Sequence, residues 1–102
     1  MAETKPQEIE MTLDEQVGAG EFSNLAAINH SGSEFIIDFV RLMPGLPKGK
    51  VVSRIILTPD HAKRFLSALR DNMAKFEKNV GVIKTQEIGI PNFKVTGRGG
   101  EA

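Results

Sequence analysis

The 102-residue sequence lacks cysteine, tryptophan and tyrosine altogether. Without cysteine, the chain can form no disulfide bond, no thiolate metal site and no cysteine nucleophile. It also has no uninterrupted apolar stretch of about 18 residues, the length that a membrane-spanning helix needs. The first residues do not have the basic-then-apolar layout of a secretory signal peptide, so we expect a cytoplasmic protein.

Charge is unevenly distributed, although the formal net charge is zero. Residues 1–21 contain six acidic side chains and one lysine, and the rest of the chain carries the compensating excess of basic residues. Few large apolar residues occur in residues 1–20, so we predict an acidic mobile arm there. Residues 82–102 contain several glycines and are expected to form a partly ordered or disordered tail. The domain itself should span residues 21–81.

Three segments of this domain have the composition of β-strands. Residues 34–43 and 50–57 are rich in β-branched and aromatic residues, and residues 22–29 show a weaker pattern of the same kind. Turn-forming residues occupy 30–33 and 44–49 between them. Because short connections favour antiparallel pairing, we predict a three-stranded antiparallel meander.

A long amphipathic helix should follow the third strand. Thr58 is a good N-cap, Pro59 suits the first helical position, and Asp60 lies at the positive end of the helix dipole. Gly81 is placed to end the helix in a left-handed cap. Between these ends, apolar residues recur at steps of three and four: Ala62, Phe65, Leu66, Leu69, Met73, Phe76 and Val80. The sequence therefore predicts an α+β domain.

Both faces of the predicted sheet carry apolar side chains. A sheet with one solvated face alternates apolar and polar residues, but the second strand is apolar at even and odd positions alike. One helix can cover only one face, and a domain this small cannot bury the other by itself. We therefore predict a homo-oligomer, a dimer or a higher assembly, in which a second copy covers the remaining face.

Strict alternation along the strands defines the predicted self-association face, which comprises Ile36, Val40, Leu42, Val52 and Ile56. The opposite set of side chains is the alternative if the two faces are exchanged. A further alternative is that residues 82–95 fold back over this face as extra strands.

The sequence offers little for catalysis. His30 and His61 are the only histidines, and the Gly-x-Ser-x-Gly nucleophile motif is absent. Two histidines without carboxylates at a matching spacing form no metal site. The glycines at 18–20 and 45–49 match neither the dinucleotide-binding nor the P-loop pattern. We expect no enzyme, no cofactor and no metal.

Asp38 is an acidic residue within an apolar strand, and a buried carboxylate needs a partner. Arg54, at an even-numbered position of the neighbouring strand, is the natural cross-strand candidate. We predict a structural ion pair between them. An enzyme built around Asp38 and His30 is the alternative, although no second catalytic group accompanies Asp38.

Basic residues are concentrated between positions 41 and 64, where Arg41, Lys48, Lys50, Lys63 and Arg64 are the predicted partner-binding residues. If the loop at 44–50 and the start of the helix lie at one end of the domain, these charges form one patch. Such a patch would bind an acidic protein segment or the phosphates of a nucleic acid. Tryptophan and tyrosine, whose rings stack on bases, are absent. We therefore favour an acidic protein segment as the partner and keep nucleic-acid binding as the alternative.

The central part of the chain resembles a small family of prokaryotic proteins of similar length, known only as a domain of unknown function. The matching motifs are Ser33-Glu34-Phe35, Asp38-Phe39, Met43-Pro44-Gly45, Lys50-Val51, Ser53-Arg54, Thr58-Pro59 and His61-Ala62-Lys63. The resemblance implies a single-domain prokaryotic protein and brings no known activity.

The order of strands and helix is also similar to that of the SecB-type export chaperone, whose sheets pack into dimers and tetramers. From this similarity and from the apolar faces, we expect a non-catalytic, oligomeric protein-binding or adaptor module, of chaperone-like character, with an unknown protein partner.

Overall fold

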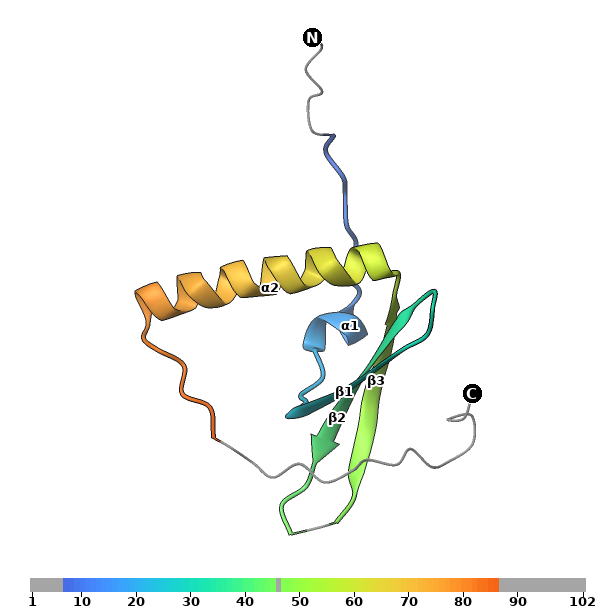
Figure 1. The fold of residues 1–102 in the computed structure, drawn as a ribbon, viewed down its shortest axis with the longest axis vertical. Coiled ribbons are helices and arrows are strands. Elements are labelled where there is room, and N and C mark those ends of the chain that lie inside the picture. The colour runs from blue at the N-terminus through green and yellow to red at the C-terminus, as the bar shows by residue number, and fades with distance from the viewer. Residues whose placement is uncertain (1–6, 46, 87–102) are drawn as a thin grey trace.

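Three antiparallel strands and one long helix dominate the described part of the chain, residues 7–45 and 47–86 of the computed structural model. The elements in chain order are a short helix α1 (Glu15–Ala19), strands β1 (Leu25–His30), β2 (Phe35–Leu42) and β3 (Gly49–Leu57), and the long helix α2 (Pro59–Asn79) (Figure 1). The predicted α+β fold, an antiparallel meander followed by a helix, is confirmed.

β2 is the central strand, with β1 on one side and β3 on the other. The turn from β1 to β2 is closed by two hydrogen bonds: the Ser31 amide donates to the Glu34 carbonyl at 2.9 Å, and the Ser33 amide donates to Ser31 Oγ at 3.2 Å. Serine and glycine thus supply the turn chemistry predicted for residues 30–33.

The register of the ladder defines two faces, because directly opposed residues of antiparallel strands point to the same side. We call them the Asp38 face, which carries Ile36, Asp38, Val40 and Leu42 of β2, and the Phe39 face, which carries Phe35, Ile37, Phe39 and Arg41. On the Asp38 face, β1 contributes Leu25 and Ala27, and β3 contributes Arg54 and Ile56.

A bulge in β3 interrupts the alternation that the sequence analysis assumed. Phe39 pairs with Ser53, but the next residue, Val40, pairs with Val51, which leaves Val52 as the extra residue of β3. Val51 therefore lies on the Asp38 face, and Val52 lies beside Phe39. Val52 is therefore not the residue opposite Val40, as the strict alternation behind the predicted self-association face assumed.

The buried core of the described residues lies at the centre of β2. Ile37, with 7% of its surface exposed, is the buried apolar residue, and Asp38, with 1%, is the buried polar one. The remaining large apolar side chains of this part of the chain are half-buried or exposed. The sheet is therefore flanked by apolar surface that residues 7–45 and 47–86 leave open.

α2 begins and ends where the sequence predicts. Thr58 Oγ1 accepts a hydrogen bond from the His61 amide at 3.1 Å, and Pro59 is the first helical residue. Asp60 forms an ion pair with Arg64 one turn later. At the other end, Gly81 has a φ of 150°, a backbone conformation that favours glycine.

α2 does not cover the sheet as the sequence analysis expected. It contacts the sheet through β3, the strand that leads into it, and then extends beyond the sheet (Figure 1). No residue of α2 is buried, and Phe65, Leu69 and Met73 are 41–46% exposed. None of the helices in the described residues is long and apolar enough to cross a membrane.

The short helix α1 was not predicted, and it lies in the segment expected to be a mobile arm. Asp14 caps it, because its Oδ1 accepts a hydrogen bond from the Val17 amide at 3.0 Å, and Gly20 follows with a φ of 82°. Residues 82–86 form no helix or strand. The prediction that 82–95 fold back over the sheet falls mainly outside the described residues.

Candidate functional site

A shallow groove lies between the α1 segment and the Phe39 face of the sheet. Its volume is about 630 Å³, and apolar atoms make up most of its lining. The residues that line it are Gln16, Val17, Gly20, Glu21, Ser23, Phe39, Val52, Ser53 and Ile55. Its lining contains no histidine or lysine and a single carboxylate, that of Glu21.

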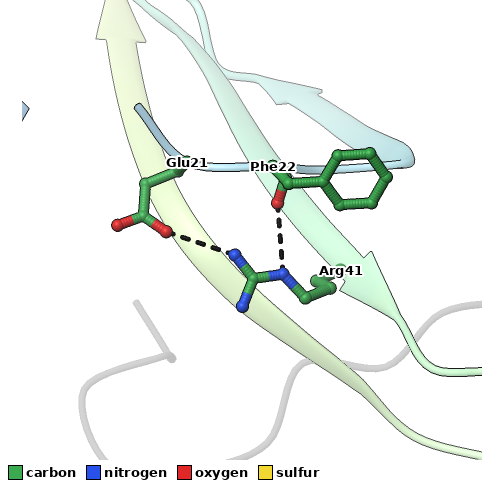
Figure 2. Close-up of polar contacts among 3 residues, drawn as sticks. All are labelled: Glu21, Phe22 and Arg41. Carbon is green, nitrogen blue, oxygen red and sulfur yellow. Dashed lines mark hydrogen bonds and ion pairs between the residues drawn. The ribbon is translucent and has the colours of Figure 1, made fainter. Parts of the chain in front are cut away.

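Arg41 of β2 contacts Glu21 and Phe22, in the segment that borders this groove (Figure 2). Its Nε donates a hydrogen bond to the Phe22 carbonyl oxygen at 3.3 Å, and its Nη2 lies 3.3 Å from Glu21 Oε1. The two charged side chains are 32% and 62% exposed, so their attraction contributes about 1 kcal/mol or less. The contact orients the segment that leads into β1.

Asn24 is the residue before β1, and its side chain extends the β1–β2 ladder by two more hydrogen bonds. Its Oδ1 accepts a hydrogen bond from the Leu42 amide at 2.8 Å, and its Nδ2 donates to the Leu42 carbonyl at 3.2 Å. The side-chain amide thereby imitates a backbone pair at the end of β2. Sequence reasoning did not single out Asn24, because an asparagine before a strand is equally common in an ordinary turn.

The predicted ion pair between Asp38 and Arg54 is present at the centre of the Asp38 face. Arg54 Nε lies 2.6 Å from Asp38 Oδ1, and Arg54 Nη2 lies 2.8 Å from Asp38 Oδ2, which is a bidentate arrangement. The hydrogen bonds and charge of Arg54 lower the pKa of the Asp38 carboxyl, although burial opposes this shift. Asp38 is thus 1% exposed, with both carboxylate oxygens bound by Arg54, as the predicted structural ion pair requires.

The two histidines do not form a site with Asp38. His30 ends β1, and its ring stacks on Phe35 with a centroid distance of 5.4 Å. The backbone of His61 completes the Thr58 cap in the first turn of α2. Residues 7–45 and 47–86 contain no cluster of three histidine or acidic side chains able to hold a metal ion.

The basic residues predicted to bind a partner do not form one patch. Arg41 and Lys50 oppose each other where β2 ends and β3 begins, with Lys48 in the adjoining loop. Lys63 and Arg64 lie in α2, beyond the other end of β3 (Figure 1). Seven strand residues at about 3.3 Å each, roughly 23 Å, separate Lys50 from the end of that strand. The expectation that the loop and the helix start share one end of the domain is wrong.

The predicted partner-binding residues also differ in whether an acidic side chain already pairs with them. Arg41 is paired with Glu21, and Arg64 is paired with Asp60. The contact with Glu21 joins the acidic N-terminal segment to one of the basic residues. Lys48 and Lys50 remain as exposed cations at the loop end of the sheet.

The apolar part of the Asp38 face surrounds the central ion pair. Ile56 is 58% exposed, Val51 41% and Leu42 39%, whereas Ile36 and Val40 are half-buried. Gly49 allows the side chains of Val40 and Leu42 to lean across β3, since a Cβ at that position would meet them at 2.8 and 2.9 Å. The result is an open apolar surface on two neighbouring strands, β2 and β3.

Comparison with protein-family models matches residues 1–85 to the family described as "Protein of unknown function (DUF3467)". The chain belongs to this family. The sequence-based identification of a small family of unknown function is thereby confirmed, and membership of DUF3467 assigns no activity and no site residue.

Comparison with curated proteins gives no match. Comparison with solved structures gives none either, so the similarity to SecB-type chaperones gains no support from it.

Proposed function

We propose that this chain is a cytoplasmic, non-catalytic homo-oligomer that serves as a protein-binding or adaptor module. The supporting observation is the amount of exposed apolar surface on the sheet and on α2, while Ile37 is the buried apolar residue of the described chain. Soluble monomers rarely expose contiguous apolar surface of this extent, and such surface usually marks an interaction site.

Self-association is proposed to use the Asp38 face, through Ile36, Val40, Leu42, Val51 and Ile56. The Phe39 face is less available, because α1 and the residues after it lie over part of that face. Removing a Val, Leu or Ile side chain completely from water contributes about 1.5–3 kcal/mol. Partial burial of five such residues from each copy therefore gives a substantial driving force for association.

A matched pair of variants tests the choice of face. Ile56 and Ile28 are both strand isoleucines, 58% and 61% exposed, but Ile56 lies on the Asp38 face and Ile28 on the Phe39 face. We expect Ile56→Lys to lower the molar mass measured by light scattering and Ile28→Lys to leave it unchanged. The reverse result would place self-association on the Phe39 face, and circular dichroism verifies that both variants fold.

The partner is proposed to be a protein segment of acidic character, bound by Lys48 and Lys50 at the loop end of the sheet. These lysines are exposed, and nearby Arg41 is already paired with Glu21. A labelled polyglutamate peptide should bind the wild type in a salt-dependent manner and should bind the Lys48→Glu/Lys50→Glu variant at least about tenfold more weakly.

The control for this test is Lys75→Glu/Lys78→Glu, which makes the same change of charge on exposed residues of α2. Equal loss in both variants would show that net charge, rather than the loop, determines binding. The separation of the basic residues argues against the nucleic-acid alternative. A chaperone-like role would use the same apolar faces for unfolded chains and would not require Lys48 and Lys50.

A further inference from the structure

The apolar stripe of α2 has the spacing of a coiled-coil seam. Six apolar residues follow one another at steps of four, three, four, three and four: Ala62, Leu66, Leu69, Met73, Phe76 and Val80. This alternation has a period of 3.5 residues, which keeps a seam on one side of a helix that pairs with another helix. A helix that merely rests on a sheet needs only the broader 3.6-residue pattern.

Nothing in the described part of the chain occupies this seam. Leu66 is 54% exposed, Leu69 46%, Met73 44% and Phe76 47%, and no residue of α2 is buried. Isolated helices are only marginally stable in water, and helices in proteins gain most of their stability by packing an apolar face. A 21-residue helix with an open seam therefore needs a partner that presents a matching seam.

We propose that α2 pairs antiparallel with α2 of a second copy of this chain, forming an interface separate from the sheet. In the register that uses the whole seam, Leu69 meets Met73 of the second copy, Leu66 meets Phe76, and Ala62 meets Val80. All six apolar positions then have an apolar partner in the second copy, and the two-fold axis crosses the helix close to Asp71.

Charge complementarity supports the antiparallel orientation. Lys63, Arg70 and Glu77 flank the seam on one side at intervals of seven residues. In the full-overlap antiparallel register, Lys63 faces Glu77 of the second copy, and this attraction occurs twice because of the symmetry. Arg70 faces Arg70 of the second copy, which adds one repulsion. Antiparallel helix dipoles also attract each other.

A parallel pair would lose these contacts. Lys63 and Glu77 are 14 residues apart along α2, which is roughly 21 Å of helix. Aligned in parallel, Lys63 of one copy and Glu77 of the other would be separated by at least that distance. The occupant of the seam is therefore a second copy in the opposite orientation.

Reversing the two charges separately and together tests this interface. We expect Lys63→Glu and Glu77→Lys each to raise the dissociation constant of the helix pair about tenfold, because each replaces two attractions with two repulsions. The double variant Lys63→Glu/Glu77→Lys restores the attraction and should return to within about twofold of the wild type. Sedimentation equilibrium of the full chain gives these constants.

Neither single change should unfold α2, because a glutamate near its N-terminus and a lysine near its C-terminus both complement the helix dipole. Glu77 Oε2 also accepts a hydrogen bond from the Ile83 amide at 3.0 Å, just after the helix. Circular dichroism verifies that helix content is retained. Single variants that associate like the wild type, or a double variant no better than the single ones, would overturn the inference.

A distance measurement tests the orientation independently. The chain has no cysteine, so Asn79→Cys provides one attachment site for a spin label. The antiparallel pair should hold the two labels more than about 20 Å apart along the helix axis, whereas a parallel pair would bring them to about 10 Å. The short distance would contradict the proposal. The sheet interface is tested separately by Ile56→Lys, so either interface can fail while the other stands.

Discussion

Asp38 contributes to both the stability and the strand register at the centre of the sheet. It is 1% exposed, and both of its carboxylate oxygens are held by Arg54. Breaking a buried ion pair leaves one charge without a counter-charge, which is more costly than never having had the pair. The contact also fixes the register of β2 against β3, because Asp38 and Arg54 are opposed in the ladder.

Asp38→Asn should lower the free energy of unfolding at pH 7 by about 3 kcal/mol, the lower part of the usual range, because the Arg54 side chain is 35% exposed. Since the folded-state pKa of Asp38 lies below 3.8, its stabilisation is complete above that value and is lost as the pH falls through the lower folded pKa. Urea unfolding from about pH 7 to about pH 2 should show the difference between the two proteins shrinking in acid. A constant difference would contradict this account.

The Asp38–Arg54 pair could be predicted, whereas the contacts of Asn24 could not. An acidic residue in an apolar strand needs a counter-charge, and Arg54 is the basic residue in the interior of the neighbouring strand. The role of Asn24 depends on where β2 ends relative to the start of β1. Sequence patterns locate such strand ends only to within a few residues.

At the scale of single elements, β3 departs most from an ideal strand. Because Val52 is an extra residue, the residues of β3 before it lie on the opposite face from the one they would have in a regular strand. Gly49 leaves room for the side chains of Val40 and Leu42 that lean over from β2. The apolar surface of the Asp38 face depends on both features. A regular β3 would place Val51 on the Phe39 face instead.

Gly49→Ala tests this packing. The new Cβ would lie 2.8 Å from Val40 Cγ1 and 2.9 Å from Leu42 Cδ2, so these side chains must move. We expect a loss of about 1 kcal/mol in unfolding free energy, measured by urea titration. Gly32→Ala is the control, because no atom lies within 4 Å of its added Cβ. Equal effects of the two changes would contradict the proposed role of Gly49.

Elements with local signals were predictable, and those without them were not. Thr58, Pro59 and the apolar stripe specify α2 within the sequence itself. α1 has only five residues and too few apolar positions for a periodic pattern. The bulge was missed because valine occupies both 51 and 52, so the composition does not reveal which of them is the extra residue.

At the scale of the whole molecule, the described part of the chain leaves apolar side chains exposed on the Asp38 face of the sheet and along the seam of α2. The sequence predicted the first from strands that are apolar on both sides. The exposure of the α2 seam was not predicted, because α2 was expected to lie across the sheet. The direction in which a helix leaves a strand depends on the geometry of the connection rather than on composition.

The most direct measurement is the molar mass of the full chain by light scattering at high micromolar concentration. A single copy has a mass of 11.2 kDa. We predict a particle of at least twice that mass, which becomes smaller when Ile56 is replaced by lysine and does not when Ile28 is. A particle of 11.2 kDa throughout the concentration range would contradict self-association through either surface.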